Sequence, residues 1–288
     1  MTLFGYLSAN AGDVNGDGVT DLLVGATSAP AVYIIFLTPQ GTSLSHQRIA
    51  EGVGSLTATG LGGGYFGGFG GGVADLNQDG VPDVMVGAHV AQDVYILFLS
   101  SIGTVVSHQK ISQTSGSFTA TGLNGFGYAG AGVLGNSASE SGFDVSVGAV
   151  STDTYGAVYI LFLSSDGTCM SHQKISDISG GLTAVLASDD QFGVHSSPVG
   201  DLNADNITDL LVGAYQPYTG SGQVYILFLT DFGVVTSHIR FGGIGGGGDL
   251  TADLETGVRF GRAVSEITII AIITLITIII LLTLITLR

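Results

Sequence analysis

The sequence lacks tryptophan, has a single cysteine and carries few charges, since only 10% of its 288 residues are Asp, Glu, Lys or Arg. With Cys169 alone, an intramolecular disulfide is excluded, although bound metal ions can stiffen an extracellular domain in place of disulfides. Basic residues are especially scarce: there are 7 Lys and Arg in all. This scarcity argues against a nucleic-acid partner, because phosphates are neutralised by clustered Lys and Arg.

Glycine and acidic residues are abundant instead. The chain has 47 Gly without a three-residue period, and 45% of it is hydrophobic, which excludes collagen and argues against disorder. Such a composition is typical of a fold with many short strands and tight turns. The 23 Asp and Glu give a formal net charge of −16, which suggests bound cations wherever carboxylates cluster.

One unit of about sixty residues recurs along the chain. Each of the four complete copies begins with Phe-Gly, continues through an Asp/Asn-rich stretch into VGA, and then has an apolar run such as VYILFL and a polar stretch such as SHQKI. The Phe-Gly pairs begin at Phe4, Phe66, Phe126, Phe192 and Phe260. Repeats of this length indicate that one supersecondary unit is used several times.

Each complete unit contains four stretches that read as strands. In the second unit they are 66–74, 81–88, 94–100 and 105–112, short and bounded by Gly, Asn, Asp or Ser. Four short antiparallel strands repeated radially form the blade of a β-propeller. We therefore expect an all-β propeller; a β-solenoid is the alternative, but its repeats are usually shorter.

The predicted propeller covers residues 1–263. It has four complete four-stranded blades and the start of a fifth, followed by an apolar tail at 264–288. The predicted bounds are 4–62, 63–122, 123–188 and 189–245 for the complete blades and 246–263 for the partial one.

Between the first two predicted strands, three units share the pattern D-x-N-x-D-[GN]-[VI]-x-D. Positions 1, 3, 5 and 9 place oxygen-bearing side chains around a tight turn, and position 7 can add a backbone carbonyl. Calcium takes six to eight oxygen ligands in flexible geometry. Position 6 needs a residue that tolerates positive φ, and it is Gly18, Gly80 and Asn206.

Asx-rich turns also occur without metal, because Asn and Asp cap their own backbone. Three carboxylates within nine residues repel one another unless a cation compensates, and the arrangement recurs three times. An EF-hand is excluded, because Val24 stands at position 12 where that motif has Glu. The degraded copy in the third unit has Asn136, Ala138, Glu140 and Asp144 at the aligned positions, and we expect weak or no calcium binding there.

The ordered Phe-Gly, DxNxDGxxD and VGA elements resemble the FG-GAP repeat of integrin alpha-subunit propellers over about residues 4–262. The resemblance implies a propeller, usually seven-bladed, with calcium in loops on one face and ligand recognition on the other. It implies about three Ca²⁺ sites, with position 7 contributing its carbonyl. Their predicted ligands are Asp13, Asn15, Asp17, Val19 and Asp21; Asp75, Asn77, Asp79, Val81 and Asp83; and Asp201, Asn203, Asp205, Ile207 and Asp209.

The sequence shows no catalytic constellation, and we expect a protein that is not an enzyme. One histidine per unit (His46, His108, His172 and His238) recurs at the same place on the polar strand. The blades would hold these side chains too far apart for one zinc ion, whose ligands lie about 2 Å from the metal.

If the Asp/Asn loops lie on one face, the loops between the second and third strands lie on the other. In those loops Tyr155, Tyr215 and Tyr218 suit recognition, since tyrosine combines contact area with a polar tip. We expect an extracellular protein or glycan ligand of unknown identity. The alternatives are a structural fragment of a larger surface protein with no ligand of its own, or the non-catalytic propeller of an enzyme.

The apolar tail contains 21 uncharged residues, 267–287. As a helix it would be about 31 Å long, enough to cross a bilayer and anchor the protein at the cell surface. Two alternatives stay open: a frameshift or truncation product, and a buried or aggregating strand, since Ile and Thr favour strands. We expect an extracellular or cell-surface location. No signal peptide is visible, which leaves open an incomplete N-terminus.

Overall fold

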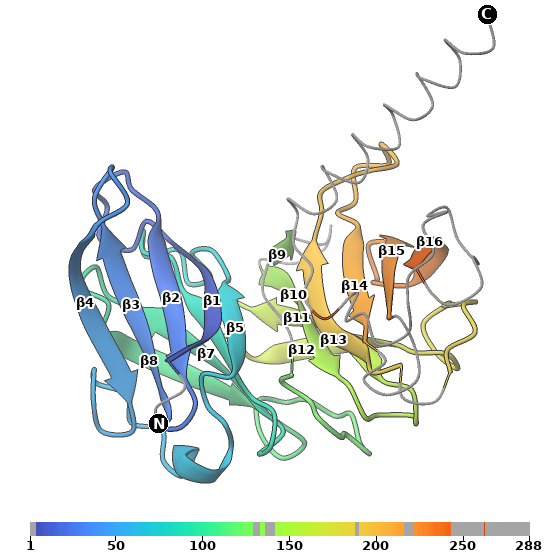
Figure 1. Ribbon diagram of the computed structural model, residues 1–288, viewed down its shortest axis with the longest axis horizontal. Coiled ribbons are helices and arrows are strands. Elements are labelled where there is room, and N and C mark those ends of the chain that lie inside the picture. The colour runs from blue at the N-terminus through green and yellow to red at the C-terminus, as the bar shows by residue number, and fades with distance from the viewer. Residues whose placement is uncertain are drawn as a thin grey trace, which may run out of the picture.

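The structure, a computed structural model, describes residues 4–128, 133–135, 142–187, 190–215, 222–242 and 262. In these residues the chain forms sixteen β-strands and one short 3-10 helix, η1 (Leu61–Gly63). The strands are divided among four separate four-stranded antiparallel sheets (Figure 1). The predicted all-β propeller architecture with four four-stranded blades is confirmed.

Every blade takes its four strands in chain order, so each strand pairs with its sequence neighbour. Blade 1 contains β1 (Phe4–Gly12), β2 (Asp21–Ala26), β3 (Ala31–Leu37) and β4 (Ser43–Ala50). Blade 2 contains β5 (Phe69–Gly72), β6 (Val84–Ala88), β7 (Asp93–Leu99) and β8 (Val105–Ile111). Blade 3 contains β9 (Val133–Gly135), β10 (Gly142–Ala149), β11 (Ala157–Ser164) and β12 (Cys169–Ile175). Blade 4 contains β13 (Phe192–Pro198), β14 (Leu210–Ala214), β15 (Gln223–Leu229) and β16 (Val235–Gly242).

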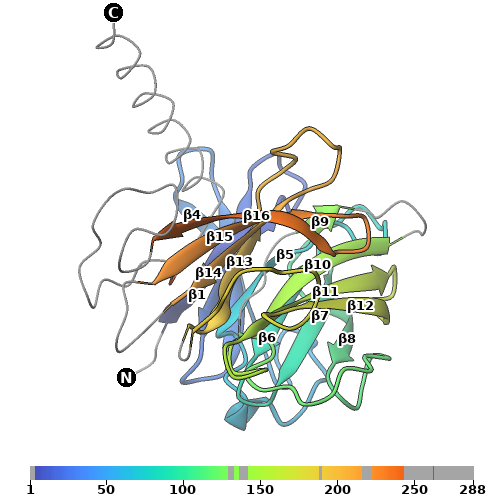
Figure 2. The same cartoon turned by 90° about the vertical axis from the view of Figure 1, so that its right-hand side faces the viewer.

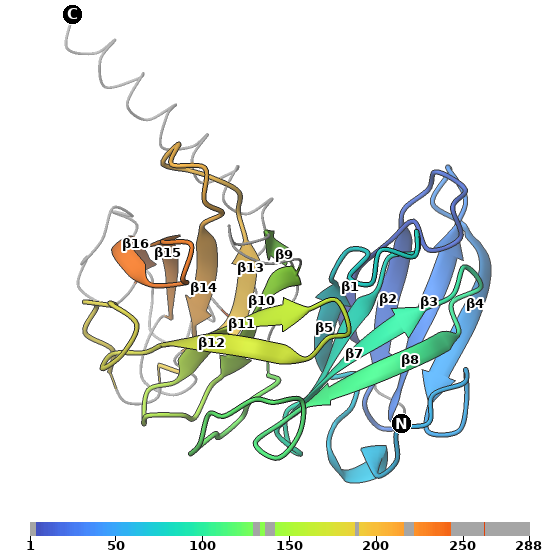
Figure 3. The same cartoon turned by 180° about the vertical axis from the view of Figure 1, so that it is seen from behind.

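The blades follow one another in space as they do in the chain. Figure 2 shows β6–β8, β10–β12 and β14–β16 as three successive layers, and Figure 3 shows blades 1 and 2 together from behind. In blade 1 the fourth strand lies at the outer edge and the first strand lies toward the middle of the molecule (Figure 1). The first-strand glycines therefore lie where the blades approach one another most closely.

Each sheet has two apolar faces, because side chains alternate along a strand. We call one side of blade 1 its trailing face and the other its leading face, and we use the same terms for the aligned residues of the other blades. The trailing face of blade 1 contains Leu23, Val32, Ile34, Phe36 and Ile49. The leading face contains Phe4, Leu22, Tyr33, Ile35 and Leu37.

The hydrophobic core lies between blades rather than within one. Three clusters each join the trailing face of one blade to the leading face of the next. In the first, for example, Ile34 and Phe36 of blade 1 pack with Tyr95 and Leu97 of blade 2. Burying such a side chain fully stabilises a fold by about 1.5–3 kcal/mol, so neighbouring blades stabilise one another.

The Phe-Gly pair belongs to this interface. Phe66 lies edge-on to Tyr95, with ring centroids 5.5 Å apart, and is fully buried. A Cβ on Gly67 would lie 2.5 Å from the Ala31 carbonyl oxygen of the preceding blade, a distance that real side chains do not tolerate. The motif is thus required by blade-to-blade packing as well as by the positive φ of its glycine.

No helix long and apolar enough to cross a membrane occurs among the residues that the structure describes. The predicted tail, 264–288, and the predicted partial blade, apart from Arg262, lie outside those residues.

Candidate metal-binding loops

Three Asp/Asn loops connect the first and second strands of blades 1, 2 and 4, as the sequence predicts. In blade 1 the loop begins just after β1 and ends at Asp21, the first residue of β2. In blades 2 and 4 the position-9 residues Asp83 and Asp209 immediately precede β6 and β14. All fifteen predicted calcium ligands lie in the described part of the chain.

Hydrogen bonds within each loop hold its polar side chains. In blade 1 the Asp13 carboxylate accepts the backbone N–H groups of Asp17 (3.0 Å) and Gly18 (2.8 Å). The Asn15 side-chain oxygen accepts the Asp17 N–H at 2.9 Å, and Asp17 accepts the Val19 N–H at 2.8 Å. The same bonds recur, within 0.1 Å, in blade 2 and blade 4.

The position-9 aspartate fastens the loop to the rest of its blade. Asp21 is fully buried and accepts the N–H of Val14 at 3.0 Å and of Leu37 at 3.1 Å. Leu37 ends the third strand, so one carboxylate joins the loop to two strands. Asp83 and Asp209 make the equivalent pairs of bonds in blades 2 and 4.

Burial disfavours the charged form of these three carboxyl groups. Desolvation is the largest cause and raises the pKa of Asp83 to about 7, and the negative charges of Asp79 and Asp75 raise it further. The pKa values of Asp21 and Asp209 are also raised, first by burial and then by neighbouring loop aspartates. A cation placed among these carboxylates would lower their pKa values again.

The loop backbone is left-handed at two positions. The predicted positive φ at position 6 is confirmed, with values of 84°, 91° and 69° at Gly18, Gly80 and Asn206. Position 4 is also left-handed, and there Gln78 and Ala204 have φ of 60° and 63°. A left-handed conformation costs a residue with a Cβ about 1–2 kcal/mol. The sequence pattern does not predict a left-handed backbone at position 4, because the pattern allows any residue there.

The donor chemistry of the loops suits a hard cation. Each loop offers three carboxylates, one amide oxygen and the position-7 carbonyl, which are the oxygen ligands that calcium prefers. With the side chains placed as described, no three His, Cys, Asp or Glu residues of the described chain form a ready metal-binding group. The loop carboxylates are instead directed at the loop's own amides. Calcium binding at these residues therefore stays a prediction.

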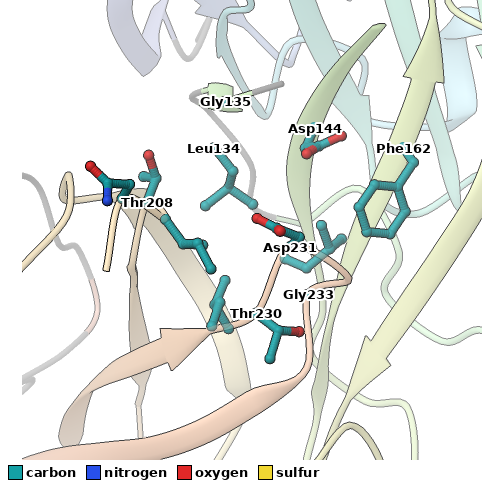
Figure 4. Close-up of a pocket in the computed structure, with 12 residues that line it drawn as sticks. Leu134, Gly135, Asp144, Phe162, Thr208, Thr230, Asp231 and Gly233 are labelled. Carbon is teal, nitrogen blue, oxygen red and sulfur yellow. The ribbon is translucent and has the colours of Figure 1, made fainter. Parts of the chain in front are cut away.

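The degraded copy in blade 3 is only partly described. Asp144 lies buried in β10, whereas Asn136, Ala138 and Glu140 lie outside the described residues. Beside Asp144 a small cavity of about 100 Å³ opens between blades 3 and 4, lined also by Leu134, Thr208 and Asp231 (Figure 4).

The predicted recognition tyrosines lie in different surroundings. Tyr155 is half-buried and packs against the core cluster between blades 3 and 4. Tyr215 is also half-buried and has the Arg262 guanidinium over its ring, 5.9 Å from the centroid. Tyr218 lies outside the described residues. Their role in ligand binding stays a prediction.

An aromatic group that sequence reasoning missed lies at the end of the blades opposite the Asp/Asn loops. Phe69 stacks on Tyr128 with centroids 4.4 Å apart, and His89 lies 4.6 Å from Tyr128 and 5.3 Å from Tyr65. Tyr6 approaches Phe69 at 5.9 Å. Blades 1, 2 and 3 thus meet in one aromatic group. The signal was present in GGYFGGFGGG, whose aromatic residues lie among the glycines of the crowded inner strand.

Two members of this group are open to solvent. Tyr6 and Tyr65 are 43% and 46% exposed. Tyr65 also has φ of 60°, an unusual value for a bulky aromatic residue. The Nδ1 atom of His89 is buried without a hydrogen-bond partner, and burial lowers the pKa of this imidazole.

The four recurrent histidines do not come together. His46, His108, His172 and His238 each lie beside the tyrosine of their own blade, with ring centroids 5.9–6.4 Å apart. They are therefore part of each blade's outer packing.

Comparison with known families agrees with the repeat pattern. Residues 4–43 and 193–227 match the FG-GAP repeat family. The chain contains FG-GAP repeats at these two segments. Mouse integrin alpha-7 is 34% identical over 137 residues, which is 43% of this chain and 10% of the relative. Human integrin alpha-7 is 34% identical over 143 residues, 46% of this chain and 11% of the relative.

The chain therefore matches about a tenth of the length of these integrin relatives. Among solved structures, BBS1N in complex with ARL6DN matches 88% of this chain and 59% of its own at 13% identity, with a TM-score of 0.43.

Proposed function

We propose that this FG-GAP propeller binds calcium in the loops of blades 1, 2 and 4, and that it serves as an extracellular adhesion or ligand-binding module. The observation that carries the proposal is the threefold recurrence of one loop geometry. In every copy a buried position-9 aspartate lies close to another loop carboxylate, one in blade 1 and two in blades 2 and 4.

Electrostatics supplies the reason for the metal. Three carboxylates held in nine residues destabilise one another, and burial of one removes the water that would screen it. A divalent cation offsets both effects and leaves the loop rigid. Within each loop the side chains of positions 1, 3, 5 and 9 and the carbonyl of position 7 would hold the ion.

The ligand would bind at the opposite end of the blades. There the exposed rings of Tyr6 and Tyr65 stand beside Phe69, His89 and Tyr128, and tyrosines are frequent anchors in interfaces because they give a large contact area with a polar tip. Similarity to integrin alpha-7 supports a protein or glycan ligand at the cell surface. We propose no catalytic role for the described residues.

A purely structural role in a larger surface protein is the second candidate. It is favoured by the open leading face of blade 1, where Phe4 is 57% exposed. The two candidates differ in one respect: only the first needs a ligand at the aromatic group.

Calcium binding is tested by thermal unfolding of the whole chain in EGTA and in increasing calcium. Binding to the native state alone stabilises by about 2.7 kcal/mol per site at a hundredfold excess over Kd. We expect Tm to rise with calcium, and we expect Glu140→Ala in the degraded copy to change that rise little. If Tm is the same in EGTA and in millimolar calcium, the proposal that the loops bind calcium is refuted.

Ligand binding is tested separately, with fluorescently labelled chain on a glycan array and on immobilised extracellular-matrix proteins. Tyr6→Ala and Tyr65→Ala should abolish any binding found. The control is Phe232→Ala, because Phe232 is 74% exposed on the hairpin at the Asp/Asn-loop end of blade 4. Equal loss in all three variants would contradict a binding role for the aromatic group, and no binding to any probe would favour the structural role.

A further inference from the structure

The Asp/Asn loop of blade 4 differs from its two counterparts at position 6. That position is Asn206 in blade 4, whereas blades 1 and 2 have Gly18 and Gly80 there. Thr208 stands two places after Asn206, with Ile207 between them, so the loop contains Asn-X-Thr with X other than proline. Such a triplet is the acceptor signal for N-linked glycosylation. It is the only Asn-X-Ser/Thr triplet in the whole sequence.

A side chain at position 6 projects into solvent. A Cβ built on Gly18 or on Gly80 would meet nothing within 4 Å, and Asn206 itself is exposed. Exposure is what a glycan acceptor needs, because the attached oligosaccharide is bulky and stays on the surface of the folded protein. The loop therefore has room for a glycan at this position.

The side-chain amide of Asn206 is also unoccupied. In each of the three loops the asparagine at position 3 donates its side-chain amide to the aspartate at position 5, at 2.9 Å in blades 1 and 2 and at 2.8 Å in blade 4. The backbone N–H of Asn206 donates to Asp201 at 2.7 Å, but its side-chain amide makes no hydrogen bond with any residue that the structure describes. Its Nδ2 atom is thus available for a covalent bond.

Neither the fold of the loop nor its proposed calcium ion uses this side chain. Asn206 has φ of 69°, and asparagine adopts the left-handed region more readily than most residues with a Cβ. The predicted calcium ligands are at positions 1, 3, 5, 7 and 9, whereas Asn206 and Thr208 hold positions 6 and 8. A glycan on Asn206 would therefore leave the ligand set of this loop complete.

The acceptor lies at the Asp/Asn-loop end of the blades. Asn206 and Thr208 line the cavity between blades 3 and 4, and so do Asp231 and Gly233 of the blade 4 hairpin (Figure 4). Phe232, between these two hairpin residues, is 74% exposed. A glycan would therefore stand beside this exposed ring and would leave the aromatic group at the opposite end accessible.

We propose that Asn206 carries an N-linked glycan. The proposal rests on the proposed extracellular location, because the oligosaccharide donor is met on the secretory route. In the reaction the Asn206 Nδ2 atom bonds to the anomeric carbon of a lipid-diphosphate-linked oligosaccharide. The bond from that carbon to the phosphate oxygen breaks, the lipid diphosphate leaves with the electron pair, and one Nδ2 proton passes to a base of the oligosaccharyltransferase. Thr208 supplies the hydroxyl group of the acceptor signal.

The acceptor is tested by expressing the whole chain behind a cleavable secretion signal in a eukaryotic host. Chain that has entered the secretory lumen is collected from cells and medium, and its peptides are identified by mass spectrometry with and without peptide-N-glycosidase treatment. We expect one glycan, on Asn206. Asn206→Gln and Thr208→Ala should abolish it, whereas Thr208→Ser keeps the hydroxyl group and should retain it.

The other two loops supply matched controls. Gly18→Asn completes an acceptor triplet with Thr20 and should add a second glycan, in blade 1. Gly80→Asn places asparagine at the same position in blade 2, but Pro82 stands where the hydroxyl group is needed, so no glycan should be added. An unmodified Asn206 would overturn the proposal, whether or not the Gly18→Asn variant is modified in blade 1.

The modified chain must also be folded. Cys169 is buried, so its thiol should react slowly with a thiol reagent in the glycosylated chain, and equally slowly after the glycan has been removed by the enzyme. A glycan confined to chain whose Cys169 reacts rapidly would overturn the proposal, because the folded loop would then not carry the glycan.

Protein purified from its own organism shows whether the acceptor is used there. A glycan on the peptide that contains Asn206 supports the proposal. If this peptide is unmodified although the secretory host glycosylates the same chain, the proposal is overturned together with the extracellular location on which it rests. An unmodified chain from the secretory host overturns the glycan site alone, because that chain has met the donor.

Discussion

Blades 1 and 2 are nearly the same unit in two different surroundings. They share the Phe-Gly start, an Asp/Asn loop whose hydrogen-bond lengths agree within 0.1 Å, and an edge-on Phe–Tyr pair. In blade 2 the leading face is covered by blade 1, whereas in blade 1 it is open. The difference separates what a blade forms by itself, namely its sheet and its loop, from what a neighbour contributes, namely the core.

The largest expected contrast concerns the motif phenylalanine. Phe66→Ala removes a fully buried ring and should lower the free energy of unfolding by about 3–5 kcal/mol. Phe4→Ala removes an exposed ring of the same motif and should cost about 1 kcal/mol or less. Urea unfolding of the whole chain measures both values. Equal losses would mean that the leading face of blade 1 is covered in solution.

The motif glycine gives the next contrast. Gly5 and Gly67 have φ of 83° and 82°, so an alanine has the same left-handed cost of about 1–2 kcal/mol at either place. Only at Gly67 does the new methyl also collide with the preceding blade. This collision should lower the free energy of unfolding by about a further 1–3 kcal/mol. Gly67→Ala should therefore destabilise the protein clearly more than Gly5→Ala in the same urea experiment. Identical losses in the free energy of unfolding would contradict the packing of Gly67 against blade 1.

The Asp/Asn loops should respond alike in the two blades. Asp17→Ala and Asp79→Ala should each remove one calcium site, and with it about 2.7 kcal/mol of calcium-dependent stabilisation at a hundredfold excess over Kd. The readout is Tm in calcium minus Tm in EGTA. Asp166→Ala, an exposed acid on the hairpin of blade 3, serves as control. If only one of the two substitutions reduces the calcium-dependent rise in Tm, the loops of blades 1 and 2 are not equivalent calcium sites.

The smallest effect involves no loss of stability. Burial raises the pKa of Cys169 to about 12, so below pH 9 its thiol stays protonated and should be labelled slowly in the folded chain. Unfolding in urea should release it. If native Cys169 is labelled as fast as a cysteine placed at Ser43, the covered and open faces do not differ in solution.

Much of this fold was predictable from repetition. The second unit was expected to have strands at 66–74, 81–88, 94–100 and 105–112, and the structure has them at Phe69–Gly72, Val84–Ala88, Asp93–Leu99 and Val105–Ile111. The short first strand is the exception. Gly67 and Gly68 have no side chains that could pack on a sheet, and Phe66 packs in the interface with blade 1.

The site was predictable to a smaller extent. Spacing alone placed the loop carboxylates and the left-handed position 6, because those follow from local chemistry. It did not reveal the left-handed Gln78 and Ala204, nor the deep burial of Asp83 beneath its loop. It also missed the grouping of Tyr6, Phe69 and Tyr128, which come from three different blades and meet only when these are stacked.

The sequence by itself determined the repeat unit, its four strands and the loop that offers oxygen ligands, because these depend on residues close together in the chain. Only the tertiary structure decided which copies of the same residues are buried. Phe4 and Phe66 stand in the same motif, yet one is open and the other enclosed. Burial is a property of a residue's neighbours, and for a blade those neighbours belong to the next repeat.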